Sequence, residues 1–194
     1  MSTDWESIYQ KGDTHWDKGA PSPGLVDFLD GKGKPKSPSS VLVPGCGFGH
    51  DVRAWATFGY QATGYDLAPS AVAGARQLTS AGPSAIFKQG DLLRDPVDSR
   101  FDWVFEHTLF CAIDPEERDR YVDAVADRLV PTGRYLSIFY MLPIEDEGPP
   151  FGSTRSEITR RFYRRFVPVE EWVPSSYPNR EGKELMILWA LRTV

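Results

Sequence analysis

The stretch Val41-Leu-Val-Pro-Gly-Cys-Gly-Phe-Gly-His-Asp51 is the most informative part of this chain. Its apolar start is typical of a buried strand, which leads into a turn with glycines at 45, 47 and 49 and then into a helix expected near Asp51. Glycines let the chain turn tightly and let a ligand lie against bare backbone. Asp66 follows the next predicted strand, and its carboxylate can accept both hydroxyls of a ribose. This order predicts a nucleoside-cofactor site in a doubly wound α/β domain.

The spacing of the glycines bears on which nucleoside is bound. The dinucleotide fingerprint is G-x-G-x-x-G, whereas here the third glycine comes one residue early and His50 stands where the last glycine is expected. A dinucleotide places its pyrophosphate at the helix N-terminus, where Asp51 would repel a phosphate and favour a cation. S-adenosylmethionine has a ribose, an adenine and a sulfonium but no phosphate, so it fits better. The candidate contacts in this region are Gly45, Gly47, Asp66 and Leu67. The alternative is a glycine turn with a purely structural role.

Length and composition limit the class of protein. The 194 residues suit one domain over 1–194, and a chain of this length buries about 70% of its unfolded surface. The formal charge of −5 argues against a general nucleic-acid binder, which would carry a basic face. No apolar run approaches the ~20 residues that cross a bilayer, and no signal peptide opens the chain. We therefore expect a cytoplasmic monomer that acts on a small molecule, with neither nucleic acid nor membrane as a partner.

The two cysteines, Cys46 and Cys111, lack metal-ligand spacing to other Cys or His residues. A disulfide framework and a metal site are therefore not expected, and the thiols fit a reducing compartment.

Apolar runs and turn residues predict alternating strands and helices. An aromatic-rich segment, 1–30, contains a short helix at 24–29 and is followed by a Gly/Lys/Pro/Ser linker, 31–40. Strands are expected at 41–44, 61–65, 84–88, 101–105 and 133–140, and helices at 51–58, 69–80, 115–129 and 154–163. Gly133 is interpreted as a residue that follows a helix end. The last two apolar runs, 165–169 and 184–191, could form an antiparallel hairpin at a sheet edge.

Two further segments follow predicted strands at the end where open α/β sheets bind ligands. Asp91 in Gly90-Asp91-Leu92 could accept from the adenine amine through its side chain, or its backbone could make the contact; the alternative is a turn cap. Glu106 and His107 follow the buried strand 101–105. His107 could act as a base, or it could be a structural hydrogen-bonding residue.

The loop 140–151 is expected to border the substrate pocket, with a solvated surface excursion as the alternative. Five arginines in and after the helix near 154–163 are expected to form a solvated face with local acid partners: Arg155, Arg160, Arg161, Arg164 and Arg165. The spacing of Trp5 and Tyr9 fits a helix face that belongs to the core or that covers the cofactor, where aromatic rings attract a sulfonium.

These segments together resemble the thiopurine S-methyltransferase family, and within it the halide, thiol and thiocyanate methyltransferases. The matching stretches are Trp5-x3-Tyr9-x6-Trp16-Asp17-x-Gly19, the 41–51 loop, Gly64-x-Asp66, Gly90-Asp91, Glu106-His-Thr-x-Phe-Cys-Ala-Ile-Asp-Pro115 and Gly148-Pro-Pro-Phe151. The resemblance implies a Rossmann-like class I methyltransferase fold, with a mostly parallel seven-stranded sheet and helices on both faces. It also implies that Trp5, Tyr9 and Trp16 close over the cofactor, although family members often carry Trp where Tyr9 stands. Further implied contacts come from Gly45, Asp66, Asp91 and Leu92, with a pocket near Tyr140.

The expected function is therefore methyl transfer from S-adenosylmethionine to a small soft nucleophile, such as a thiol, sulfide, halide or thiocyanate, by in-line displacement. Because the methyl is already activated by positive charge, the protein mainly supplies alignment. If a proton must move, Tyr140 and His107 are the candidate catalytic residues. The alternatives are methylation of oxygen, nitrogen, selenium or tellurium on another small molecule, a nicotinamide-dependent oxidoreductase, and a protein that binds the cofactor without turnover.

Overall fold

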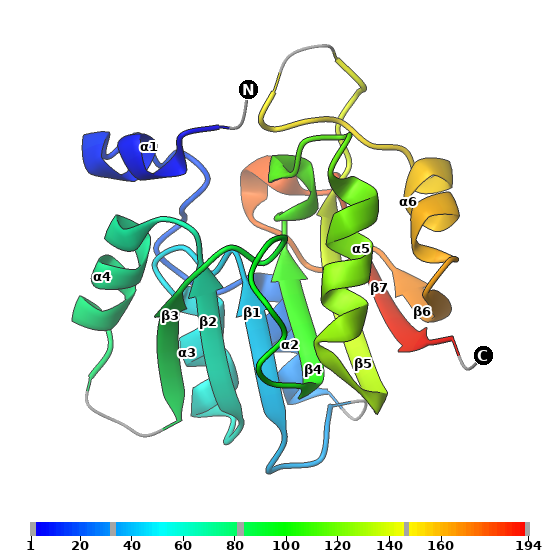
Figure 1. Ribbon diagram of the computed structural model, residues 1–194, viewed down its shortest axis with the longest axis horizontal. Coiled ribbons are helices and arrows are strands. Elements are labelled where there is room, and N and C mark those ends of the chain that lie inside the picture. The colour runs from blue at the N-terminus through cyan, green and yellow to red at the C-terminus, as the bar shows by residue number, and fades with distance from the viewer. Residues whose placement is uncertain (1–2, 32–33, 81–83, 146–147, 193–194) are drawn as a thin grey trace. The chain divides into compact units, whose positions relative to one another are not determined.

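The computed structural model describes residues 3–31, 34–80, 84–145 and 148–192 (Figure 1). The chain divides into two compact units, Met1–Asp95 and Pro96–Val194. The expectation of a single domain stays a prediction. Among the described residues, no helix is both long and apolar enough to span a membrane.

The first unit is built on three parallel strands, in which β1 pairs with β2 and β2 pairs with β3. Its strands are β1 (Ser40–Pro44), β2 (Gln61–Asp66) and β3 (Ala85–Gln89). Its helices are α1 (Trp5–Lys11), α2 (Pro23–Asp30), α3 (His50–Thr57) and α4 (Pro69–Gln77). Each predicted strand and helix of this unit is present, with ends that differ by a few residues from those expected.

Gly64 in β2 explains how closely α3 packs on the strands. A Cβ at this position would lie 2.8 Å from the Cys46 sulfur and 2.9 Å from Val52 of α3. Real Cβ atoms do not approach other atoms so closely, so only glycine fits without a rearrangement. This close approach sets the glycine loop and the first turn of α3 directly against β2.

The described part of the second unit carries four strands, β4 (Phe101–His107), β5 (Leu129–Tyr140), β6 (Phe166–Trp172) and β7 (Glu184–Leu191). Between them lie η1 (Phe110–Ala112), α5 (Arg118–Asp127), α6 (Arg155–Phe162) and η2 (Pro178–Arg180). β4 and β5 are parallel, and β7 is antiparallel to both β5 and β6. The predicted hairpin of the last two apolar runs is therefore confirmed.

The seven strands follow the order β3-β2-β1-β4-β5-β7-β6. The expectation of a Rossmann-like α/β fold with a mostly parallel seven-stranded sheet is confirmed, with β7 as the reversed strand. The carboxyl ends of β1 and β2 carry the glycine loop and Asp66, which is where the sequence placed the ligand site.

Aromatic side chains fill the core of the second unit. The ring of Phe162 stacks on Tyr135 at 5.6 Å and on Trp189 at 5.1 Å, and it meets Phe139 edge-on at 5.5 Å. These rings come from α6, β5 and β7, so one residue of α6 fixes that helix against two strands. All four side chains are buried.

The prediction for Gly133 is wrong. Helix α5 ends at Asp127, and Gly133 lies inside β5, which starts at Leu129. Pro131 and Gly133 are typical turn residues, but Leu129 pairs with Phe101 of β4 and the ladder shifts register before Trp103. A Cβ on Gly133 would lie 2.9 Å from the Val130 carbonyl oxygen, which indicates a bend within the strand. Strand pairing thus overrides the local turn preference.

Candidate active site

The glycine loop has the left-handed backbone that its sequence predicts. Gly45, Gly47 and Gly49 have φ values of 59°, 52° and 77°. Space is restricted as well, since a Cβ on Gly47 would lie 3.0 Å from the Tyr9 hydroxyl and one on Gly49 would lie 2.4 Å from Phe87. Both conformation and space therefore require glycine at positions 47 and 49.

Asp66 links the glycine loop to the turn after β2. Its Oδ2 accepts from the Gly47 N–H at 2.8 Å, and its Oδ1 accepts from the Ala68 N–H at 3.0 Å. The side chain is buried, and this burial raises the pKa of Asp66 although the backbone N–H groups lower it in part. The carboxylate has lone pairs beyond those that these N–H groups use, and one of them can accept from a hydroxyl. Leu67 follows with 48% of its surface exposed, an apolar side chain at the edge of the loop.

The three aromatic residues of the N-terminal segment lie together. Trp16 meets Trp5 and Tyr9 edge-on, at ring distances of 5.6 and 5.8 Å. Tyr9 in turn meets Phe48 of the glycine loop edge-on at 5.4 Å. Burial raises the pKa of Tyr9, and the nearby charge of Asp66 adds to that effect. Aromatic residues of the N-terminal segment and of the glycine loop are therefore in contact, and the covering of the cofactor by Trp5, Tyr9 and Trp16 stays a prediction.

Asp91 forms a turn cap, which is one of the two roles that its sequence position allows. Its Oδ1 accepts from the Leu93 N–H at 2.8 Å, and its Oδ2 lies 3.1 Å from the Arg94 guanidinium. Its own N–H donates to Asp95 Oδ2, which also accepts from the Tyr65 hydroxyl at 2.5 Å. Asp95 was missed by the sequence analysis, although an acid soon after a Gly-Asp turn is a usable signal. The adenine contacts of Asp91 and of the buried Leu92 stay predictions.

Glu106 is fully buried at the end of β4. Its Oε2 accepts from the N–H groups of Leu109 at 2.6 Å and Phe110 at 3.3 Å. Burial raises the pKa of Glu106 to about 7, while these two hydrogen bonds lower it in part. The carboxylate therefore binds the backbone of the turn that follows Thr108. Thr108 itself has a left-handed backbone, with a φ of 59°. The predicted cofactor contact of Glu106 is a separate role that stays a prediction.

His107 lies in a polar cluster with two buried charged residues. Its Nε2 is 3.2 Å from Glu184 Oε1 and 3.4 Å from Arg180 Nη1. The Ser176 hydroxyl donates to Glu184 Oε2 at 2.6 Å. Burial works to raise the pKa of Glu184, but hydrogen bonds from His107 and Ser176 and the charges of His107 and Arg180 lower it overall. Glu184 thus serves as an anionic partner that orients the imidazole.

Tyr140 joins the same cluster through Arg180. The guanidinium carbon of Arg180 lies 5.1 Å from the centre of the Tyr140 ring and 6.0 Å from that of Tyr177. Both sequence candidates, His107 and Tyr140, therefore lie around Arg180. Arg180 and Glu184 were missed, although Arg180 stands four residues before the last apolar run and Glu184 stands at its start. Because β7 is antiparallel to β5 and Glu184 pairs with Tyr140, the start of β7 meets the carboxyl end of β5.

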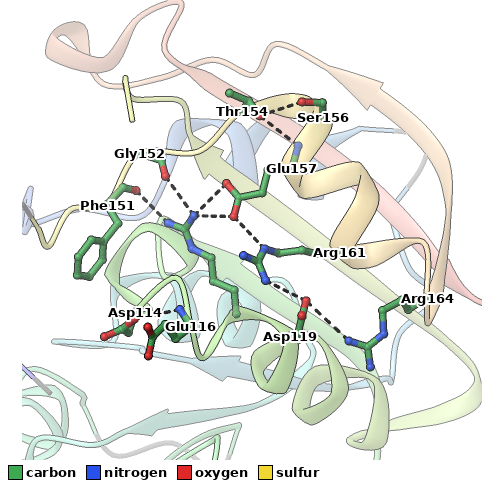
Figure 2. Close-up of polar contacts among 11 residues, drawn as sticks. Asp114, Glu116, Asp119, Phe151, Gly152, Thr154, Ser156, Glu157, Arg161 and Arg164 are labelled. Atoms are coloured by element: carbon green, nitrogen blue, oxygen red, sulfur yellow. Dashed lines mark hydrogen bonds and ion pairs between the residues drawn. The ribbon is translucent and has the colours of Figure 1, made fainter. Parts of the chain in front are cut away.

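The loop after β5 is fastened at its far end by Arg118 of α5. This buried guanidinium donates to the carbonyl oxygens of Phe151 and Gly152 and to Glu157 of α6, each at 3.1 Å. Figure 2 shows Glu157 reaching on to Arg161, whose guanidinium also pairs with Asp119. Residues 141–145 and 148–154 have no regular secondary structure, as expected. The position of this loop at a substrate pocket stays a prediction.

Four of the five arginines in α6 and the turn after it have acid partners, as expected, and for Arg160 the expectation stays a prediction. Arg155 pairs with Glu171, Arg164 with Asp119 and Asp123, and Arg165 with Asp123 and Asp127. Within the described ranges, no group of three or more His, Cys, Asp or Glu side chains is placed to hold a metal ion.

The residues of the first unit fit S-adenosylmethionine. Gly47 offers backbone without a side chain, and Asp66 supplies a buried acceptor beside it. The first turn of α3 carries Asp51, whose Oδ1 accepts from the Ser22 N–H at 2.7 Å. An acid at that helix start disfavours the phosphate of a dinucleotide.

The fold and the glycine loop place the chain among the class I S-adenosylmethionine-dependent methyltransferases. A solved structure of the 1,6-didemethyltoxoflavin-N1-methyltransferase of Burkholderia thailandensis, with bound S-adenosylhomocysteine, has the same fold. Its TM-score is 0.73 at 21% identity, over 98% of this chain and 86% of that one.

The chain belongs to the thiopurine S-methyltransferase (TPMT) family, whose model matches residues 1–176. It is 32% identical to thiocyanate methyltransferase 1 of Brassica oleracea and 33% identical to thiocyanate methyltransferase 1 of Arabidopsis thaliana. Each comparison spans 95% of this chain and 83% of the relative. The protein is therefore a methyltransferase that uses S-adenosylmethionine.

Proposed function

We propose that this methyltransferase transfers a methyl group to a small soft nucleophile, namely a thiol, sulfide, halide or thiocyanate, by in-line displacement. The observation that carries the proposal is the cluster around Arg180, where a buried guanidinium lies against the rings of Tyr140 and Tyr177. A guanidinium is weakly hydrated and planar, so it pairs well with weakly hydrated, polarisable anions. The similarity to two plant thiocyanate methyltransferases supports the same acceptor class.

The cofactor supplies a methyl group on a positively charged sulfur. Gly47 and Asp66 bind and orient its nucleoside, while the rings of Trp5, Tyr9 and Trp16 exclude water and attract the positive charge.

Arg180 and Tyr140 hold the acceptor. An anionic acceptor needs no base; a thiol with a pKa near 8.5 is already partly ionised at neutral pH. For such a thiol, His107 is the group that holds the proton, oriented by Glu184 at 3.2 Å. Catalysis then comes mainly from proximity and alignment.

The test is the release of S-adenosylhomocysteine when the purified protein is given S-adenosylmethionine and one acceptor at a time. The acceptors are iodide, thiocyanate, sulfide, small thiols and thiophenols, with a catechol and an amine as controls. We expect turnover with at least one soft nucleophile and none with the controls. Turnover with the catechol or the amine alone would overturn the proposal.

A second arm of this test uses Arg180→Met, which keeps most of the side-chain volume and removes the charge. We expect KM for an anionic acceptor to rise at least tenfold while the affinity for S-adenosylhomocysteine stays unchanged. An unchanged KM would remove Arg180 from the acceptor site.

We also propose that the protein acts in the cytoplasm as a monomer, without a nucleic-acid or membrane partner. The support is the free state of Cys46 and Cys111, which fits a reducing compartment, and the mild negative charge. Light scattering on the purified protein and fractionation of cells that produce it would test the two statements.

A further inference from the structure

The start of helix α4 is capped by a side chain from helix α1. Its N-cap residue is Ala68, which has no side-chain hydrogen bond, and the next residue, Pro69, has no N–H. Ser70 is therefore the first donor of the helix. Its N–H donates to Glu6 Oε2 at 2.9 Å and its hydroxyl donates to Glu6 Oε1 at 2.6 Å. A glutamate from α1, 64 positions earlier in the chain, supplies the acceptors that an N-cap side chain usually provides.

This contact joins two parts of the cofactor site. Helix α4 starts directly after Ala68. The N–H of Ala68 donates a hydrogen bond to Asp66 Oδ1. Helix α1 carries Trp5 and Tyr9, and the Tyr9 ring packs on Phe48 of the glycine loop. In Figure 1 the two helices lie next to each other, with α1 beside the start of α4. Glu6 therefore connects the helix that carries aromatic rings to the turn that carries the ribose acceptor.

Two further hydrogen bonds lie at the start of α1 and within it. Asp4 accepts from the Ser7 N–H and so caps its own helix, and the Gln10 amide donates to Glu6 Oε1 at 2.8 Å. The attachment of α1 thus has an aromatic part, through Tyr9 and Phe48, and a charged part, through Glu6 and Ser70. Hydrogen bonds to a charged carboxylate are stronger than those between neutral groups. Loss of the charged part should loosen α1 without detaching it.

We propose that Glu6 is a positioning residue that holds α1, with Trp5 and Tyr9, over the glycine loop by binding Ser70, and that it thereby slows the release of S-adenosylmethionine and S-adenosylhomocysteine. The proposal rests on the methyltransferase function proposed above. It assigns to Glu6 an effect on how long the cofactor stays bound rather than on the methyl transfer itself.

The experiment measures the dissociation rate of S-adenosylhomocysteine by surface plasmon resonance, with no acceptor present. We expect Glu6→Ala to raise this rate about tenfold. Ser70→Ala removes one of the two hydrogen bonds and should give a smaller increase. Glu6→Gln keeps an acceptor oxygen and should fall between Glu6→Ala and the wild type. Gln10→Ala is the matched control, because it removes the contact of Glu6 within α1 and leaves Ser70 bound.

A second substitution separates the positioning role from simple capping. Ser is a preferred N-cap residue, and Ala68 has the extended backbone of an N-cap, so Ala68→Ser gives α4 a cap of its own. In the double variant Glu6→Ala/Ala68→Ser, hydrogen exchange at the Ser70 amide should return toward the wild-type rate. The fast release of S-adenosylhomocysteine should persist, because the link to α1 is still absent. If the double variant restores slow release as well, Glu6 acts only as a cap and the proposal is wrong.

The outcomes distinguish this proposal from the function on which it rests. If the wild type binds S-adenosylhomocysteine and Glu6→Ala releases it at an unchanged rate, the positioning role is refuted and the methyltransferase function stands. If the wild type does not bind S-adenosylhomocysteine, both are refuted. In steady-state assays Glu6→Ala should raise KM for S-adenosylmethionine and leave KM for the acceptor unchanged.

Discussion

Two buried acidic residues, Asp66 and Glu106, lie at strand ends in different surroundings. Asp66 is the last residue of β2 and Glu106 lies near the end of β4, and both accept backbone N–H groups of the turn that comes next. Leu67 beside Asp66 is half-exposed, whereas Glu106 is fully buried among its own turn residues. The sequence marks both as acids near strand ends; both are buried and both support the backbone, and the exposed neighbour Leu67 is what sets the surroundings of Asp66 apart.

The burial of Glu106 predicts a pH dependence of stability. Its pKa rises from the ordinary value of 4.5 to about 7 in the folded protein. Between these values the unfolded chain has lost the proton that the folded protein keeps, so the contribution to stability is complete below pH 4.5 and is lost as pH rises through 7. The slope can reach about 1.4 kcal/mol per pH unit within that window. Glu106→Gln should remove this part of the slope in urea unfolding followed from pH 4.5 to 7.5.

The control for this measurement is Glu170→Gln, which removes a charge from an exposed position on β6. Its unfolding curves should keep the wild-type pH dependence. If Glu106→Gln also keeps it, the carboxyl of Glu106 does not hold its proton in the folded protein.

At the scale of secondary-structure elements, Arg118 joins α5, α6 and the end of the loop after β5. Its side chain is 1% exposed, and its guanidinium also lies 4.5 Å from the centre of the Phe110 ring. Removing it leaves the Glu157 carboxylate and two carbonyl groups without this donor. Arg118→Met should therefore lower the free energy of unfolding by about 3 kcal/mol. Removing one member of a buried ion pair is this costly because the groups that remain have lost their buried donor.

Arg155 provides the matched control for Arg118. Its contact with Glu171 is shorter, at 2.6 Å, but its side chain is 67% exposed. Solvent screens such a pair, so Arg155→Met should lower the free energy of unfolding much less than Arg118→Met. Equal losses in the two variants, measured by urea unfolding, would mean that burial does not decide the strength of these contacts.

The sequence predicted the elements that depend on local patterns and missed the contacts that depend on distance along the chain. The glycine loop, Asp66 and the last hairpin follow from residue spacing and apolar runs, which is why they were found. Gly133 was misinterpreted because its neighbours resemble a turn, while the pairing of Leu129 with Phe101 decides the conformation. The hydrogen bonds between Glu6 and Ser70 join residues 64 positions apart, and the contact between His107 and Glu184 joins residues 77 positions apart. No local sequence pattern predicts such contacts.

At the scale of the whole molecule, cofactor binding should raise the free energy of unfolding. A ligand that binds only the folded protein adds about 2.7 kcal/mol when its concentration is 100 times Kd. S-adenosylhomocysteine at that excess should therefore raise Tm by several degrees for a chain of this size. Asp66→Ala should lose the shift, because the ribose acceptor is gone, and scanning calorimetry with and without ligand measures both.

Leu67→Ala is the companion variant, since Leu67 is exposed and donates no polar group to the site. It should keep a reduced shift. The dinucleotide NAD should give no shift with the wild-type protein, because the acid at the start of α3 opposes its phosphates. A shift with NAD and none with S-adenosylhomocysteine would contradict the assignment of the cofactor.

The edge-on contact between Trp5 and Trp16 gives the protein an optical reporter at its proposed cofactor site. Trp16 is 37% exposed and lies beside Tyr9, whereas Trp55 and Trp189 are buried in the two cores. Emission from the buried pair should be blue and constant, while emission from Trp5 and Trp16 should respond when a ligand enters beneath them. The binding step can therefore be followed by intrinsic fluorescence without a label, and Trp16→Phe would assign the signal.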